Sequence, residues 1–246
     1  FGLSTETDPK VAEVVRSANR KITHLFVTSQ AVKPFYEEAF AVPPERIYPT
    51  GIPVTDIYFD EERICQRKSS FYQKYPELAS KKILLYAPTF RRTDEENRQI
   101  MDRFDAERIH QILGDEWVIL IRMHPKFPVE NLPQNKYCYN MTDYNDITDL
   151  YLVSDLFITD YSSSVVEYAL LDKPILLFAY DLAEYDRGFY FDYENMMPGQ
   201  IAHTQTELYE LLQNNCDNLP KRQNFVKFQY DNMKGDACGR ILDILG

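Results

Sequence analysis

Residues 156–167 read LFITDYSSSVVE, and this stretch decides the fold that the sequence predicts. Its first four residues form an apolar run of strand length, and a helical pattern begins among the serines. An apolar strand that passes through a short polar turn into a helix is the repeating unit of a parallel α/β sheet. Ligands of such sheets bind beyond the carboxyl ends of the strands. The polar turn that contains Asp160 therefore marks the predicted binding edge.

The three consecutive serines favour an anion site at the start of the helix. Orphan N–H groups and the helix dipole attract negative charge there. Ordinary N-capping by Ser162 or Ser163 is the alternative, but a cap needs only one hydroxyl, so Ser164 and its two neighbours favour binding. Glu167, one turn into the helix, could accept both hydroxyls of a ribose. No nucleophile-elbow motif surrounds the serines, so a serine nucleophile is not indicated.

Outward from this stretch, strand-like and helix-like segments alternate. We predict an α/β fold, namely a Rossmann-like parallel sheet with helices on both faces. Ser29, and Thr204 with Glu207 at capping-box spacing, mark two helix starts. The predicted strands are residues 24–28, 46–50, 82–87, 117–123, 136–139, 156–159 and 175–179, and the predicted helices are residues 30–40, 61–75, 97–113, 147–154, 163–170 and 206–214.

The Gly-Ile-Pro turn at residues 51–53 predicts a domain boundary. Residues 1–50 are interpreted as the end of a preceding domain, residues 51–233 as a domain of their own, and residues 234–246 as a C-terminal helix. The first residue is Phe1 rather than Met, so we expect that the true beginning of the chain is missing.

The predicted strand at residues 82–87 runs into a turn suited to phosphate, because Thr89, Arg91 and Arg92 follow it. The planar guanidinium of arginine matches phosphate oxygens bidentately, which a lysine cannot do. The alternative is a solvated turn in which the arginines pair with the acidic residues at positions 94–96.

A second such strand end carries Arg122, His124 and Pro125. A histidine held there can donate to a phosphate or assist a leaving group. A lone histidine is more often structural, but its position and the nearby arginine favour a function. The other histidines are weaker candidates: His24 at a strand start is interpreted as structural, His110 lies on a helix and His203 in a loop. Residues 186–193 form either a packed Ω-loop or a loop that closes over a ligand.

Composition excludes several function classes. Basic residues number 27 and acidic residues 38, a formal net charge of −11, which argues against nucleic-acid binding. The four cysteines show no C-x-x-C spacing and favour reduced thiols over a zinc site or a disulfide framework. The longest apolar runs are far shorter than a membrane span, and no signal peptide is visible. Nothing in the sequence indicates an oligomeric state.

Five ordered blocks resemble one known family. They are GIPVTD at residues 51–56, YAPTFR at 86–91, RMH at 122–124, DLFITDYSS at 155–163 and RGFYFD at 187–192. Together they resemble the CDP-glycerol glycerophosphotransferases, the teichoic acid primases and polymerases of Gram-positive bacteria. The resemblance implies a GT-B architecture, with residues 1–50 on the acceptor side and residues 51–233 as the domain that holds the CDP-linked donor.

The resemblance also implies roles for single residues. His124 is similar to the histidine that the family places at the diphosphate, and it is the predicted catalytic residue. Asp160, Ser162 and Ser163 are similar to its donor-binding turn, and Thr89 and Arg91 to its second phosphate-facing loop. The family has a second essential histidine in its N-terminal domain. No residue matches that histidine, so we expect this chain to be inactive alone. Val54 departs from the arginine common in the family.

The implied reaction transfers glycerol phosphate from CDP-glycerol to a membrane-linked polyol-phosphate acceptor and releases CMP. The enzyme would be cytoplasmic and peripheral on the inner face of the plasma membrane. No cofactor is evident, and Mg²⁺ is left open because the diphosphate could bring its own metal ion. Three alternatives remain: CDP-ribitol or another CDP-polyol as donor, a UDP-sugar enzyme of the same architecture, and a nucleotide-binding module without catalysis.

Overall fold

A computed structural model describes residues 8–124, 132–185, 188–214, 217–231 and 233–246. The chain forms two compact units. The first contains residues 1–61, 185–196 and 223–246, and the second contains residues 62–184 and 197–222. Residues 51–61 and 223–233 thus group with the first unit, while the predicted domains, residues 1–50, 51–233 and 234–246, stay a prediction. The expected functional division into an acceptor side and a donor side stays a prediction.

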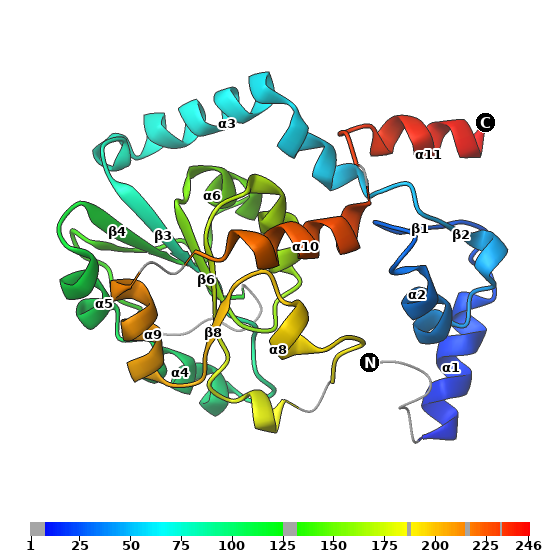
Figure 1. Ribbon diagram of the computed structural model, residues 1–246, viewed down its shortest axis with the longest axis horizontal. Helices are drawn as coiled ribbons and strands as arrows, with labels where there is room; N and C mark the ends of the chain where they lie inside the picture. Colours follow the sequence, from blue (N-terminus) through cyan, green and yellow to red (C-terminus); the bar gives the residue numbers. More distant parts are fainter. Residues whose placement is uncertain (1–7, 125–131, 186–187, 215–216, 232) are drawn as a thin grey trace. The chain divides into compact units, whose positions relative to one another are not determined.

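The second unit is built on a six-stranded parallel sheet (Figure 1), which confirms the predicted fold class. Its strand order is β5-β4-β3-β6-β7-β8. From β3 the chain winds outward through β4 and β5, and then returns to the other side of β3 with β6. The carboxyl ends of β3 and β6 therefore flank the point at which the winding direction reverses. The strands are β3 Lys82–Tyr86, β4 Trp117–Ile121, β5 Cys138–Asn140, β6 Leu156–Thr159, β7 Ile175–Phe178 and β8 Gln200–Ala202.

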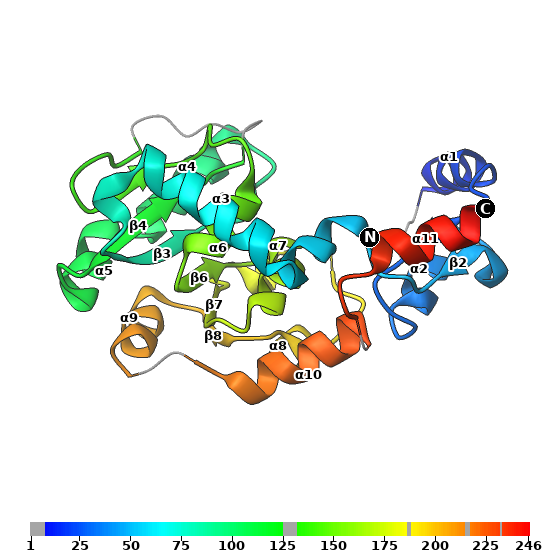
Figure 2. The same ribbon diagram turned by 90° about the horizontal axis from the view of Figure 1, so that it is seen from above.

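Both faces of the sheet are covered, because the central strands are apolar at successive positions. Leu84 and Tyr86 belong to a core shared with three helices, α4 Asp94–Arg103, α5 Ala106–Leu113 and α9 Gln205–Gln213. The Tyr86 ring stacks on Phe104 at 3.6 Å between centroids. On the opposite face, Phe157 packs against the rings of Tyr151 and Tyr168. Figures 1 and 2 show α5 beside β4 and α9 beside β8.

The helices of this unit are α3 Glu61–Lys74, whose first residue belongs to the other unit, α4 Asp94–Arg103, α5 Ala106–Leu113, α6 Ile147–Val153, α7 Ser164–Tyr168 and α9 Gln205–Gln213. The single helix predicted over residues 97–113 is wrong, because Asp105 caps a new helix by accepting the Arg108 N–H. Thr204 caps α9 as predicted, but Glu207 accepts the N–H of His203 and does not complete a capping box.

Several elements were not predicted from the sequence. Strand β8 has three residues, only one of them buried, so it carries no alternation to detect. Helix α1, Pro9–Asn19, begins at Asp8, which accepts the Lys10 N–H, and helix α10 covers Leu219–Tyr230. The strand predicted at residues 136–139 begins two residues later.

The first unit contains a small parallel pair, β1 Leu25–Phe26 and β2 Ile47–Tyr48, with helix α2 Lys33–Phe40, the 3₁₀ segment Pro53–Phe59, helix α8 Tyr193–Met196 and helix α11 Ala237–Leu245. Ser29 accepts the Val32 N–H at the start of α2 and donates its own hydroxyl to Phe228 O at 2.7 Å.

The GIPVTD block lies in this unit and has a structural role. Gly51 adopts a left-handed φ of 82°, which favours glycine. Asp56 caps helix α11 by accepting the N–H groups of Ala237 and Cys238, each at 2.9 Å. Burial would raise the pKa of Asp56, but these donors outweigh it and lower the pKa.

Gly199 permits the close approach of the turn before β8 to β7. A Cβ at this position would lie 2.2 Å from the carbonyl oxygen of Ile175, which is backbone and cannot move aside cheaply. We expect Gly199→Ala to lower the free energy of unfolding by about 1–3 kcal/mol, the usual cost of overpacking. Gly239→Ala is the control, because nothing lies near its Cβ and alanine favours a helix interior by about 0.5–1 kcal/mol. Urea denaturation measures both, and equal effects would refute the steric explanation.

Candidate functional site

The candidate site lies at the carboxyl edge of the sheet in the second unit. Thr89 and Arg91 follow β3, His124 follows β4, and Asp160 follows β6. Strands β4, β3, β6 and β7 are neighbours in that order. These four residues therefore lie at the edge of the sheet where the winding reverses, which is where ligands of doubly wound sheets bind.

The ends of β3 and β6 are joined by direct hydrogen bonds. The hydroxyl of Thr159 donates to Ala87 O at 2.7 Å, and the Ala87 N–H donates to Ile158 O at 3.0 Å. One oxygen of Asp160 then accepts the N–H of Thr89 at 2.7 Å and the N–H of Tyr161 at 2.6 Å. These hydrogen bonds hold the start of the loop after β3 against the start of the loop after β6.

Arg91 is held between two carboxylates. Its Nη2 donates to Asp160 at 2.9 Å and to Asp181 at 3.0 Å, while its Nε donates to Asp181 at 2.7 Å. Only 10% of its side chain is exposed, against 2% for Asp160 and 18% for Asp181. Asn97 fixes the backbone of Arg91, accepting its N–H and donating to its carbonyl. The Tyr161 hydroxyl donates to Asp181 at 2.8 Å.

Burial and charge oppose each other in this cluster. Burial would lower the pKa of Arg91, but the charge of Asp160 and the hydrogen bonds to Asp181 raise it. Burial raises the pKa of Asp160, against the opposing effects of Arg91 and the Thr89 N–H. Burial also raises the pKa of Tyr180, whose ring lies 5.6 Å from the guanidinium, to about 12. The guanidinium is therefore a permanent cation that the protein itself neutralises.

The carboxylate partners of Arg91 are Asp160 and Asp181 and not the acidic residues at positions 94–96. Phosphate binding by this loop stays a prediction. Glu96 instead completes a capping box with Thr93, the N-cap of α4, and Glu95 pairs with Arg98. Arg92 is exposed.

The serine turn is closed by Ser162 and leaves Ser163 exposed. Ser162 accepts the N–H of Ser164 at 3.2 Å, and the two hydroxyls lie 2.9 Å apart. Ser163 makes no capping hydrogen bond and is exposed, while Glu167 is half-buried in α7. Ser162 therefore closes a local turn ahead of α7, and a role of Ser162, Ser163, Ser164 and Glu167 in donor binding stays a prediction.

Arg122 and His124 diverge although they are two residues apart. Arg122 donates to the carbonyl oxygens of Met141, at 3.4 Å, and Tyr144, and burial lowers its pKa. It therefore supports the loop after β5. The His124 ring packs edge-on against Phe90 at 4.8 Å between centroids, which brings it to the loop after β3.

Sequence reasoning missed Asp181. It follows the predicted strand at residues 175–179, so the rule that selected Asp160 could have selected it too. It was overlooked because a single acidic residue in a loop is ordinary on an acidic chain. The pairing with Arg91 spans 90 residues, a separation at which no local pattern operates.

The weaker candidates have structural surroundings. His24 stacks on Phe26 and Tyr48 in the first unit. In the aromatic loop, Tyr190 contacts Phe35 and donates to Glu38 of α2, which favours the packed alternative. Pro125, Arg187, Cys216 and the first four residues lie outside the described residues.

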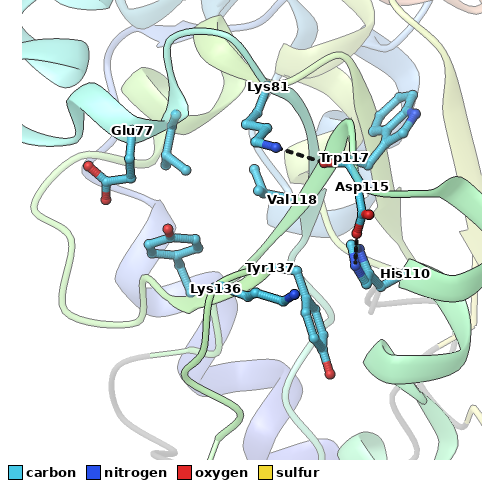
Figure 3. A pocket seen from close by; sticks show the side chains of 10 residues that line it. Glu77, Lys81, His110, Asp115, Trp117, Val118, Lys136 and Tyr137 are labelled. Atoms are coloured by element: carbon cyan, nitrogen blue, oxygen red, sulfur yellow. Dashed lines mark hydrogen bonds and ion pairs between the residues drawn. The ribbon is translucent and has the colours of Figure 1, made fainter.

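A cavity of about 490 Å³ lies at the opposite, amino edge of the sheet (Figure 3). Lys81 donates to Asp115 O at 2.8 Å, and His110 lies 3.3 Å from an Asp115 carboxylate oxygen and stacks on Tyr137. Lys136 also lines it. None of the predicted site residues does, so this cavity is separate from the candidate site.

Within the described ranges, no group of three or more His, Cys, Asp or Glu side chains could hold a metal ion. The same part of the chain contains no helix that is long and apolar enough to cross a bilayer.

The sheet order and the polar strand ends define the class of doubly wound, Rossmann-like α/β proteins. More specifically, the chain belongs to the family described as CDP-Glycerol:Poly(glycerophosphate) glycerophosphotransferase, which it matches over residues 1–245. This confirms the family resemblance seen in the sequence.

Individual relatives agree. The chain is 35% identical to the teichoic acid poly(ribitol-phosphate) polymerase of Bacillus spizizenii strain W23, covering 92% of this chain and 37% of that protein. It is also 35% identical to the teichoic acid glycerol-phosphate transferase of Staphylococcus aureus, covering 72% of this chain and 47% of that protein. The chain thus spans less than half the length of either relative.

A solved structure supports the same family. A variant of the wall teichoic acid polymerase TagF, soaked with CDPG, superimposes with a TM-score of 0.82 at 27% identity. The match covers 98% of this chain and 61% of the TagF chain.

We expect Arg91→Met to lower the free energy of unfolding by about 3–5 kcal/mol, because removing one partner leaves buried carboxylates uncompensated. Arg92→Met is the matched control: this neighbour is exposed, so its replacement should change stability by no more than about 0.5 kcal/mol. Chemical denaturation of both variants measures the difference. Equal stability would show that the Arg91 ion pairs do not hold the loops.

Proposed function

We propose that this chain holds a CDP-linked polyol at the carboxyl edge of its six-stranded sheet. The enzyme would transfer the polyol phosphate, glycerol phosphate in the first instance, to a teichoic acid acceptor and release CMP. The observation that carries this proposal is the convergence of His124, Asp160 and the serine turn beside the β3/β6 reversal in a chain of this family.

The proposed reaction is a displacement at phosphorus. A terminal hydroxyl of the acceptor attacks the phosphorus that carries the polyol, the bond to the CMP oxygen breaks, and CMP leaves. Negative charge grows on the phosphoryl oxygens and on the leaving phosphate, so positioned donors supply most of the rate. His124 is proposed to donate to the diphosphate, and Ser163 with the N–H groups of its turn to bind it. The proton of the hydroxyl would go to a second histidine, which the resemblance places in the N-terminal domain.

A CDP-ribitol donor is the second candidate. The Bacillus spizizenii relative is named for poly(ribitol-phosphate), and the Staphylococcus aureus relative of equal identity is named for glycerol phosphate. Both polyols are linked to the same cytidine diphosphate, so the nucleotide half of the site would serve either donor.

The remaining parts of the proposal concern the whole enzyme. We propose a membrane-linked acceptor, a cytoplasmic location at the inner face of the membrane, and no transfer by this chain alone. The last point rests on the missing match to the second histidine. Of the other described histidines, His24 belongs to the first unit, His110 lines the amino-edge cavity and His203 follows the edge strand β8.

The chain should bind cytidine nucleotides in preference to others. We expect calorimetry to give a lower Kd for CMP and CDP-glycerol than for UMP, UDP-glucose and AMP. The proposed donor contacts all lie within residues 89–167, so binding needs no other domain. Equal affinity for all of these nucleotides would exclude a cytidine site. Preference for uridine would favour a UDP-sugar enzyme.

We expect His124→Ala to lower the turnover of the complete enzyme by about a hundredfold or more, the scale of a lost catalytic acid or charge donor. CMP release from CDP-glycerol measures it. His203→Ala is the control, because His203 is exposed and precedes α9. Both variants should unfold at the same denaturant concentration as the unsubstituted enzyme. Normal turnover per folded molecule of His124→Ala would make His124 structural.

A further inference from the structure

The loops after β3, β6 and β7 meet at one guanidinium. Arg91 belongs to the loop after β3, Asp160 to the loop after β6 and Asp181 to the loop after β7. The rings of Tyr161 and Tyr180 lie 5.3 and 5.6 Å from its central carbon. Nothing about this arrangement requires a ligand, because the protein already supplies two carboxylates to one cation.

Asp160 and Asp181 have different structural roles. Asp160 is almost fully buried, and its other oxygen accepts the backbone N–H groups of Thr89 and Tyr161, so it belongs to the frame of both loops. Asp181 is more exposed and contributes both oxygens to Arg91, one of which also accepts the Tyr161 hydroxyl. Asp181 therefore fixes the orientation of the guanidinium from outside the two donor loops.

We infer that Asp181 is a positioning residue for the donor, acting through Arg91 and Tyr161. It holds the loop of Thr89 and the turn of Ser162 in the arrangement that binds the CDP-linked polyol. This inference rests on the proposed function and adds to it a residue from a loop that carries none of the predicted contacts. Arg91 then acts on the donor through these loops, with its Nε and Nη2 donors kept on carboxylates.

Loss of the Asp181 carboxylate should weaken donor binding because of the geometry of its pair with Arg91. A bidentate arginine–carboxylate pair fixes both the distance and the plane of its partners. With the Asp181 carboxylate removed, the guanidinium keeps Asp160 but can turn about that contact, and the β3 and β6 loops lose their common brace. The donor contacts that the two loops carry then lose their alignment, so a weakened brace should appear first in donor affinity.

A competing role would have the opposite sign. If Asp181 occupied Arg91 only until a donor phosphate displaced it, removal of the carboxylate would free a cation for the phosphate and tighten binding. Positioning predicts weaker binding. The direction of the change in Kd therefore separates the two roles.

The experiment is calorimetry of the chain with CMP and CDP-glycerol, using Asp181→Ala, Asp181→Asn, Tyr161→Phe and the control Glu184→Ala. Glu184 is an exposed acid three residues further along the same loop. Asp181→Ala should raise Kd at least about tenfold, a loss consistent with displaced contacts. Asp181→Asn, which keeps an acceptor oxygen, should raise it less, and Tyr161→Phe least. Glu184→Ala should leave Kd unchanged.

Two readouts separate positioning from loss of folded protein. Unfolded molecules lower the binding stoichiometry and leave Kd unchanged, whereas misplaced loops raise Kd at full stoichiometry. In the complete enzyme the donor KM should rise more than kcat falls. A Kd for Asp181→Ala equal to or below that of the unsubstituted chain would overturn the inference. No cytidine-nucleotide binding by the unsubstituted chain would overturn the proposed function itself, and the donor role of Asp181 with it.

Discussion

The buried guanidinium of Arg91 is the interaction on which the carboxyl edge of the sheet depends. Asp160 and Asp181 compensate it from two other loops, and all three groups are largely withdrawn from solvent. Burying such a pair is costly unless its geometry and remaining hydrogen bonds are good. Here one oxygen of Asp160 accepts two backbone N–H groups, so the carboxylate that cannot reach water is satisfied by the loops that it joins.

Residues that occupy similar positions in the sequence have different roles in this arrangement. Arg91 and Arg122 both follow apolar strands, yet one joins three loops and the other holds the carbonyls of Met141 and Tyr144. His124 remains beside Phe90 at the edge where a ligand is proposed to bind. Arg91 and Arg122 thus support the site, whereas His124, close to them in the sequence, is proposed to act on the donor. Their surroundings in the fold differ accordingly.

Much of the fold could be predicted from the sequence because its central strands are short, continuous apolar runs. The end of each apolar run also marked the end of a strand. The residues that follow these ends include His124, Asp160 and the serine turn. Two kinds of information were missing. Strand β8 and the break between α4 and α5 depend on tertiary contacts and on the Asp105 cap, which periodicity does not report. The partners of Arg91 lie 69 and 90 residues away, so only the folded sheet reveals that its charge is neutralised within the protein.

The central claim is that the donor nucleotide binds at the carboxyl ends of β3 and β6. A crystal structure of the chain soaked with CMP tests this claim most directly. The account predicts electron density for the phosphate within hydrogen-bond distance of the Ser162–Ser164 turn and of His124, with Arg91 still paired to Asp160 and Asp181. Density for CMP in the amino-edge cavity beside Lys136 and Tyr137, with the carboxyl edge empty, would contradict it.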